Sequence, residues 1–277
     1  MEEEVGRPWP ERRRRVRELQ ARYPFLEDQL RLYAALLEVW EETCSDPPPG
    51  PEALAHARAR VLPGVVEATV RAAPERLARA AEERFRQADP DQLLGRWLAG
   101  AEQADVDRYL ARASLDPLLE VLDPGSAAAL CSGPRDERHC PSCGGPPQLS
   151  WYPAGGASLE TGPRRLRCAR CGRSWAFARL ACAVCGEREG SRLPVFGEAR
   201  AGEGELVVRG LAAEDPSLVL PHLRVEACDA CHSFLVGVDL GREARAVPVV
   251  DELAALPLVL HASERGYRKA VPNLMGL

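Results

Sequence analysis

The chain has 277 residues, a formal net charge of -5 and 28% charged residues. This length favours two or three domains, and the acidic balance gives no general attraction to nucleic acid or to an anionic membrane. No stretch approaches the roughly 18 apolar residues of a membrane span, and the amino terminus contains no apolar export segment. We therefore expect a cytoplasmic protein, with no membrane insertion and no nucleic-acid partner.

The first half of the chain, to about residue 131, has the residue spacing of helices that are interrupted by proline. Between residues 25 and 40 the apolar side chains recur every three or four positions, as expected of a buried helix face. They are Leu26, Leu30, Tyr33, Leu37 and Trp40. Further helices are expected over residues 52–62, 74–87, 91–99 and 104–113, each bounded by Pro, Gly or Asp. Short connections between them favour an all-α domain.

The composition changes near Pro134, where alanine-rich segments give way to Gly, Pro, Cys and short β-prone runs. Strands are expected over residues 174–178, 206–209 and 234–238, and a final helix over about residues 250–264. We therefore predict an α+β multidomain chain. It has a helical domain (1–133), two small rubredoxin-like or zinc-ribbon-like β modules (134–181 and 182–248), and a C-terminal helix and tail (249–277).

Eight of the ten cysteines fall in four CxxC pairs, in a chain without an export signal, which favours metal thiolate over disulfides. Two cysteines separated by two residues can bind one ion from a single tight turn, here called a knuckle. Glycine follows Cys143, Cys171 and Cys185 and allows the positive φ that such turns often need. Only the fourth knuckle differs, because His232 follows Cys231.

The lengths between the knuckles indicate how they pair. They are 24 residues between the first and second, 10 between the second and third, and 42 between the third and fourth. Ten residues leave little room for two hairpins, so we expect two successive all-cysteine sites, with the interleaved pairing left as the alternative. Site 1 is Cys140, Cys143, Cys168 and Cys171, and site 2 is Cys182, Cys185, Cys228 and Cys231.

Tetrahedral coordination by four sulfurs suits both zinc and iron, so spacing leaves the two metals open. A four-iron cluster lacks the third closely spaced cysteine of its common motif, and thioredoxin-like chemistry would use a single CxxC on a βαβ unit. Cys44 and Cys131 lie outside the pairs and are interpreted as buried thiols. His139 and His232 flank knuckles, where complete cysteine sets leave them outside the ligand set.

Arginines cluster around the second knuckle in the segment RRLRCARCGRSW. We interpret them as a solvated face that balances the thiolate charge, with contact to an acidic partner as an alternative. The same run motivates the alternative of a nucleic-acid-binding zinc ribbon, and the sulfur sites motivate that of a rubredoxin-like redox protein. No catalytic set of residues is recognised, so the chain is not expected to be an enzyme.

The order of the motifs resembles that of the formate dehydrogenase accessory protein family, FdhE. The resemblance covers about residues 138–277 and rests on HCPSCGGPP, LRCARCGRSWAFARLACAVCG, VEACDACHSFL, VVDELAAL, ERGY and the terminal PNL. Trp175, Arg179, Glu226 and Asp251 also stand where family members carry similar residues, although Ser174 and Ala176 depart from the family pattern.

The resemblance implies a cytoplasmic maturation factor with two rubredoxin-like iron-binding modules. Such a chaperone-like protein would bind the catalytic subunit of formate dehydrogenase and support its assembly or activation. Two metal ions are then expected, with iron as the native metal and zinc as the alternative.

Overall fold

The computed structural model of the chain describes residues 8–154, 162–200, 206–210 and 217–276. Residues 1–7, part of the terminus in which we find no export segment, lie outside that description. The chain forms two compact units. The first comprises Met1–Gly145, Ala169–Arg173 and Leu274–Gly276, and the second comprises Pro146–Cys168, Ser174–Asn273 and Leu277.

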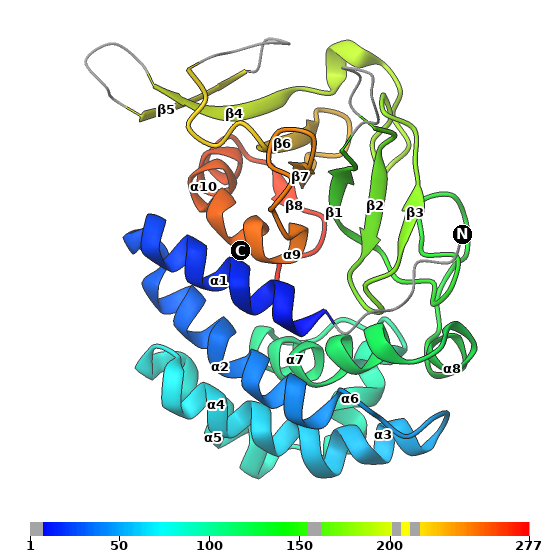
Figure 1. Cartoon of the computed structure of the whole chain (residues 1–277). Helices are drawn as coiled ribbons and strands as arrows, with labels where there is room; N and C mark the ends of the chain where they lie inside the picture. The colour runs from blue at the N-terminus through cyan, green and yellow to red at the C-terminus, as the bar shows by residue number, and fades with distance from the viewer. Residues whose placement is uncertain (1–7, 155–161, 201–205, 211–216, 277) are drawn as a thin grey trace. The chain divides into compact units, whose positions relative to one another are not determined.

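The first unit is helical, as the sequence predicts (Figure 1). Short 3-10 and π-helical turns (η) extend two of its α-helices. In chain order the elements are α1 (Trp9–Arg22), η1 (Pro24–Leu26), α2 (Glu27–Thr43), α3 (Glu52–His56), η2 (Ala57–Val61), α4 (Leu62–Ala72), α5 (Glu75–Gln87), α6 (Pro90–Leu98), α7 (Asp105–Val121) and α8 (Pro124–Leu130).

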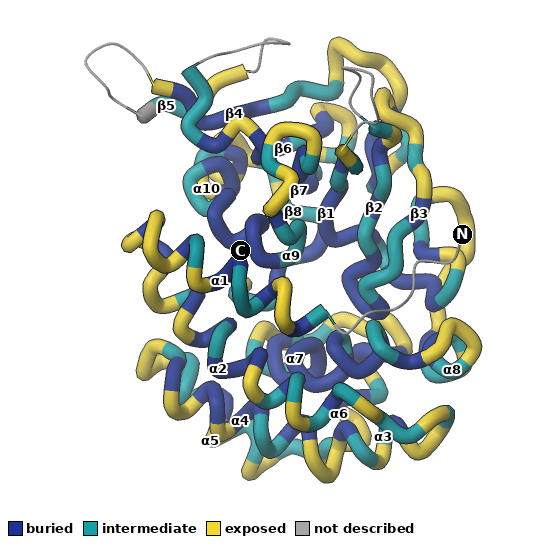
Figure 2. Tube along the Cα trace, viewed as in Figure 1, coloured by how far each residue is buried: buried dark blue, intermediate teal, exposed yellow. Residues whose placement is uncertain are grey.

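The helical core is built around α7, which contacts α2, α4, α5 and α6 and is largely buried in Figure 2. The predicted apolar stripe before and along α2 faces this core, because all five of its side chains are buried. Trp40 anchors α2 by donating its indole N–H to the Ala113 carbonyl of α7 at 2.8 Å. This bond gives the buried indole the partner that it needs.

Two helical segments run further than the sequence spacing predicts. The helix expected to end at residue 62 continues through Pro63 to Ala72, with a π-helical turn just before the proline. The helix expected to end at residue 113 includes Pro117 and reaches Val121. Proline lacks the amide hydrogen of the helix ladder, but α4 and α7 pack against each other, and tertiary packing can override local propensity.

The second unit contains a mixed sheet with the strand order β3-β2-β1-β7-β6-β4-β5, with β8 beside β7. The strands are β1 (Pro147–Tyr152), β2 (Arg165–Cys168), β3 (Ser174–Ala176), β4 (Val195–Arg200), β5 (Leu206–Gly210), β6 (Leu223–Cys228), β7 (Ser233–Asp239) and β8 (Arg268–Lys269). Three antiparallel strands, β3-β2-β1, form one side, and β7-β6-β4-β5 form the other.

One parallel pairing joins the two groups of strands. β1 lies beside β7, with Leu149 opposite Val236 and Tyr152 opposite Asp239. The strands of the two predicted metal modules therefore share one continuous sheet. The predicted C-terminal helix is present as α9 (Pro248–Asp251), η5 (Glu252–Ala255) and α10 (Leu256–Glu264), and α10 packs on β4 and β6.

The predicted fold class is confirmed: a helical region is followed by β structure with two cysteine clusters and a C-terminal helix. The exact domain limits given from the sequence stay predictions. In the described part of the chain, no helix has the length and the apolar character required to cross a bilayer.

Candidate metal centres

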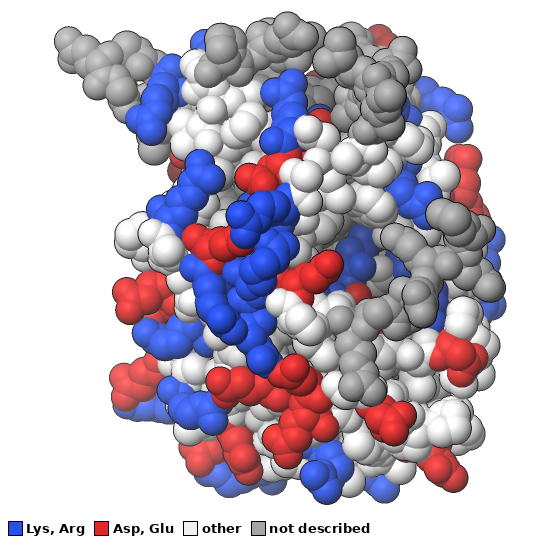
Figure 3. All heavy atoms as spheres, in the orientation of Figure 1, with Lys and Arg blue, Asp and Glu red and all other residues white. Residues whose placement is uncertain are grey.

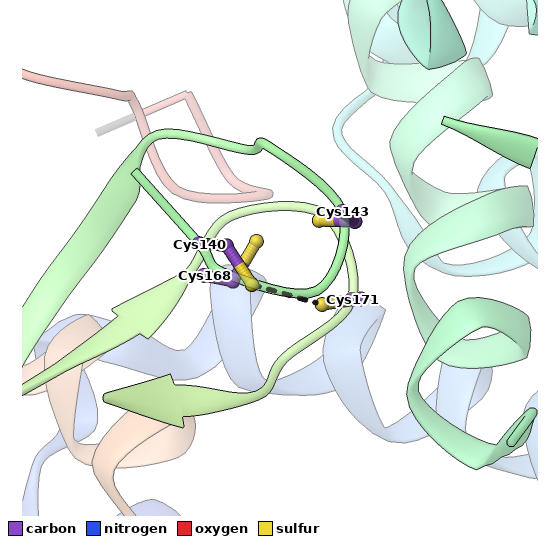
Figure 4. Close-up of side chains that lie close together, drawn as sticks. All are labelled: Cys140, Cys143, Cys168 and Cys171. Atoms are coloured by element: carbon purple, nitrogen blue, oxygen red, sulfur yellow. Dashed lines mark hydrogen bonds between the residues drawn. The ribbon is translucent and has the colours of Figure 1, made fainter. Parts of the chain in front are cut away.

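The first cysteine cluster is formed by the knuckle before β1 and the knuckle between β2 and β3. Its members are Cys140, Cys143, Cys168 and Cys171, and their sulfur atoms all lie within 4.8 Å of one another. Figure 4 shows the two loops facing each other, with Cys140 Sγ 3.6 Å from Cys171 Sγ. All four side chains are buried.

The second cluster repeats this arrangement with the knuckle before β4 and the knuckle between β6 and β7. Cys182 Sγ lies 3.7 Å from Cys231 Sγ, and Cys185 Sγ lies 3.7 Å from Cys228 Sγ. In contrast to the first cluster, Cys185 is exposed and Cys231 is partly exposed. The structure thus groups successive knuckles, as the sequence spacing favours, and not interleaved ones.

A left-handed residue closes each of the four knuckles. Gly144, Gly172 and Gly186 have φ values of 71°, 67° and 81°, and His232, at the matching place in the fourth knuckle, has φ 52°. The amides of Gly144, Gly186 and His232 each donate to the carbonyl of the first cysteine in their knuckle, at 2.9, 3.0 and 2.9 Å. The role predicted for the glycines is therefore confirmed, and histidine is among the side chains that can adopt this conformation.

The sulfur spacing fits tetrahedral coordination. An ion about 2.3 Å from each of four tetrahedral thiolates places neighbouring sulfurs about 3.8 Å apart. The observed separations of 3.6 to 3.7 Å are close to that value. In the second cluster, the Val184 amide also donates to Cys182 Sγ at 3.4 Å. Both clusters could hold a metal ion, and their geometry suits zinc and iron alike.

Two arginines of the second knuckle lie within Ala169–Arg173 of the first unit and bind backbone carbonyls of that same unit. Arg170 donates to the carbonyls of Ser132, at 2.6 Å, and Leu98, and its guanidinium lies over the Trp97 ring. Arg173 donates to Leu119 O at 3.3 Å. Since Arg164 and Arg170 are only 3% and 5% exposed, the interpretation of this run as a solvated face is wrong for these two residues. Their charge and hydrogen bonds instead fix internal structure.

The two cysteines outside the pairs are buried, as expected. Burial raises the pKa of Cys44 to about 12, so its thiol is a poor nucleophile at neutral pH. Cys131 lies beside the first cluster, where a side-chain hydrogen bond with Cys143 and burial raise its pKa. Close contact between the backbones of Gly133 and Gly144 places these segments together. Nothing in the cysteine spacing predicts that Cys131 lies beside the first cluster.

The histidines that flank the knuckles are not members of either cluster. His139 Nδ1 lies 2.7 Å from Asp136 Oδ1, and His232 supplies the left-handed turn described above. That neither histidine is a metal ligand stays a prediction.

With this geometry established, comparisons with known proteins point to one family. Residues 204–275 match the model of "FdhE, C-terminal domain". The chain is 28% identical over 144 residues to the FdhE homolog of Aquifex aeolicus, and 30% identical over 136 residues to that of Pseudomonas aeruginosa. The chain is therefore similar to FdhE proteins, and its residues 204–275 resemble their C-terminal domain. These two matches span about half of the chain but only 42% and 38% of the relatives.

Two further FdhE comparisons extend over almost the whole chain. The FdhE homolog of Rhizobium meliloti is 24% identical over 91% of this chain and 85% of its own length. The crystal structure of the FdhE protein from Pseudomonas aeruginosa superposes with a TM-score of 0.62 and 24% identity, over 96% of this chain and 94% of that one. The structural likeness establishes a shared fold for the helical and β units.

Proposed function

We propose that this FdhE-type chain is a cytoplasmic accessory protein, not an enzyme, that binds the catalytic subunit of formate dehydrogenase and supports its assembly or activation. The observation that carries the proposal is the pair of four-cysteine clusters, whose order along the chain is the one on which the resemblance to FdhE rests. Such turns, when they hold a metal ion, can keep the loops of a partner-binding surface in one geometry.

We further propose that all eight clustered cysteines are metal ligands, giving two ions per chain, with iron as the native metal and zinc as the alternative. Four thiolates complete a tetrahedral site and leave no position for water or substrate. The ions would therefore stabilise the knuckles or carry electrons, and would not activate a bound molecule. Metal analysis of protein purified without oxygen distinguishes the two metals.

The structure offers little support for a nucleic-acid interface. Figure 3 shows basic side chains gathered over α1, with acidic side chains beside them. Arg12 pairs with Glu120 at 2.6 Å, and Arg14 pairs with Glu18 at 2.9 Å. In the second knuckle, Arg170 is buried on carbonyl oxygens. These arginines are already engaged with groups of the protein, so we favour a protein partner.

Binding to the partner is tested by immobilising the chain and exposing it to an extract that contains the formate dehydrogenase catalytic subunit. We expect the subunit to be retained by the intact chain and by a Cys131→Ser variant, because Cys131 lies outside both clusters. Retention should fall at least severalfold for Cys168→Ser, which breaks a cluster.

A host strain that lacks this chain provides the second measurement. Formate dehydrogenase activity should fall in that strain and return when the intact chain is supplied. If the subunit is not retained and the activity is unchanged by the deletion, the proposed function is abandoned.

The unequal exposure of the two clusters predicts unequal metal release. A chelator should remove the ion from the second cluster severalfold faster than from the first, because Cys185 is exposed whereas all four cysteines of the first cluster are buried. Release followed with a coloured chelator should show two phases of equal amplitude. Cys185→Ser should lack the fast phase and Cys168→Ser the slow one, and the reverse assignment would contradict the prediction.

A further inference from the structure

The segment that follows α10 returns to the second cysteine cluster. This return segment, residues 264–269, has the sequence ERGYRK. It belongs to the second unit, as do all four cysteines of the second cluster. Its last two residues form β8, which runs parallel to β7 with Arg268 opposite Ser233. The return segment therefore lies beside the end of the fourth knuckle, Cys228–Cys231.

The turn that ends α10 fixes the direction in which the return segment leaves the helix. Gly266 has φ 84°, and its amide donates to the Ser263 carbonyl at 3.0 Å. The Tyr267 amide donates to the Ala262 carbonyl, also at 3.0 Å. A left-handed glycine with these two bonds is a Schellman turn, which satisfies the last carbonyls of a helix. The position of Tyr267 is thus set by the end of α10.

The Tyr267 side chain binds the fourth knuckle. Its hydroxyl donates to Asp229 Oδ1 at 2.6 Å, and Asp229 directly follows Cys228 in the chain. The backbone of Asp229 is held as well, because its amide donates to the Arg192 carbonyl at 2.9 Å. The Tyr267 ring also packs near Phe196 of β4, with the ring centres 6.1 Å apart. Since the ring is already held, the hydrogen bond to Asp229 requires little further ordering.

The fourth knuckle differs from the other three because a histidine, His232, adopts its left-handed conformation. A residue with a Cβ is less stable in that conformation than glycine. The return segment contacts this residue twice. The Arg268 amide donates to the His232 carbonyl at 2.7 Å, and the rings of His232 and Tyr267 lie 6.1 Å apart between centres. The return segment therefore supports the residue that closes the knuckle.

We expect the fourth knuckle to open when an ion is released from the second cluster. Cys185 is exposed, but Cys228 is only 1% exposed. A competing ligand therefore cannot reach all four sulfurs while the knuckle stays closed. Because Asp229 is the chain neighbour of Cys228, a bond that holds Asp229 in place also restrains Cys228.

We propose that the hydrogen bond between Tyr267 and Asp229 is a latch that keeps the fourth knuckle closed and slows exchange of the metal ion in the second cluster. Tyr267 is then a positioning residue of this metal centre, which acts through the knuckle and does not bind the ion. The latch joins residues 38 positions apart. This inference rests on the metal ligation proposed above and adds a role for the return segment in the second site.

The test compares the release of zinc from the zinc-loaded intact chain and from a Tyr267→Phe variant, followed with a coloured chelator. The variant keeps the aromatic ring and loses only the hydroxyl. We expect the phase that Cys185→Ser lacks, which belongs to the second cluster, to become at least about fivefold faster, because one charge-assisted hydrogen bond is lost. The phase of the first cluster should keep its rate.

Tyr109→Phe is the matched control for Tyr267→Phe. It removes the same atom from the helical unit, where the Tyr109 hydroxyl lies 2.5 Å from Thr69 Oγ1. Zinc release from the second cluster should be unchanged in this variant. Equal acceleration by both variants would indicate a general loss of stability and would overturn the latch.

Substitutions of Asp229 separate the hydrogen bond from the other properties of this residue. Asp229→Asn keeps an acceptor oxygen, so its zinc release should stay within about twofold of the intact chain. Asp229→Ala should release zinc from the second cluster as fast as Tyr267→Phe. Adding Tyr267→Phe to Asp229→Ala should have no further effect, because both changes remove the same contact. Additive effects of the two changes would contradict the proposal.

Metal content separates the latch from the ligation on which it rests. Two zinc ions per intact chain, with equal release rates in the intact chain and in a folded Tyr267→Phe variant, would overturn the latch alone. Fewer than two ions per intact chain would overturn the proposed ligation and the latch with it.

Discussion

Replacing Cys168 with serine is expected to remove one of the two metal ions and to destabilise the β2–β3 hairpin. Serine is a poor ligand for a metal that prefers sulfur, and a structural metal site contributes its binding free energy to folding. Because zinc-finger sites supply about 10–16 kcal/mol at neutral pH, the loss of one site should exceed the effect of any surface substitution. Metal content per chain and denaturant unfolding measure the two effects.

The matched control is Cys131→Ser, which changes the same atoms in a buried thiol beside the first cluster. Cys131 contacts Cys143 but is not a member of the four-cysteine group, so this variant should keep both ions. The helical far-UV signal should persist in both variants. Two ions per chain in Cys168→Ser would show that the proposed ligand set is wrong.

Replacing Glu226 with glutamine should destabilise the second unit by about 3–5 kcal/mol. Glu226 is the shared counter-charge of Arg164 and Arg224, and the Arg164 side chain is 3% exposed. Glutamine keeps the shape but leaves two guanidinium charges without an anion in a poorly solvated place. Denaturant unfolding at neutral pH should therefore show a lower transition midpoint with little change in slope.

Glu264→Gln provides the control for that substitution, because it removes the same charge from an exposed position on α10. Its effect should stay within about 0.5 kcal/mol. An equally small effect for Glu226→Gln would mean that the buried ion pairs contribute nothing to stability.

The difference in unfolding free energy between the intact chain and Glu226→Gln should depend on pH. The pKa of Glu226 is lowered from its ordinary value of 4.5 to about 2 in the folded chain. The stabilisation from its charge is therefore fully present above pH 4.5 and is lost as the pH falls toward 2. The stability difference between the intact chain and Glu226→Gln should shrink over that window. A difference that stays constant down to pH 2 would contradict this assignment.

Local patterns were sufficient to predict much of the fold. The three-to-four spacing of Leu30, Leu37 and Trp40 predicted a buried helix face, because helical periodicity and burial are both set within a few turns. The same local reasoning made the prediction end two helices too early, before Pro63 and Pro117. A proline indicates a break in its own turn, whereas the packing between α4 and α7 depends on distant segments.

The sequence by itself favoured grouping successive knuckles, with an interleaved pairing left open, and predicted the glycines that close three of them, because a CxxC turn is local. The tertiary structure decided the rest of the chemistry. It joined β1 to β7 in one sheet, buried Arg164 against Glu226, and brought His222 to Asp251. These contacts link residues that are 29 to 87 positions apart. Their pairing depends on how whole elements pack, which no short run of residues encodes.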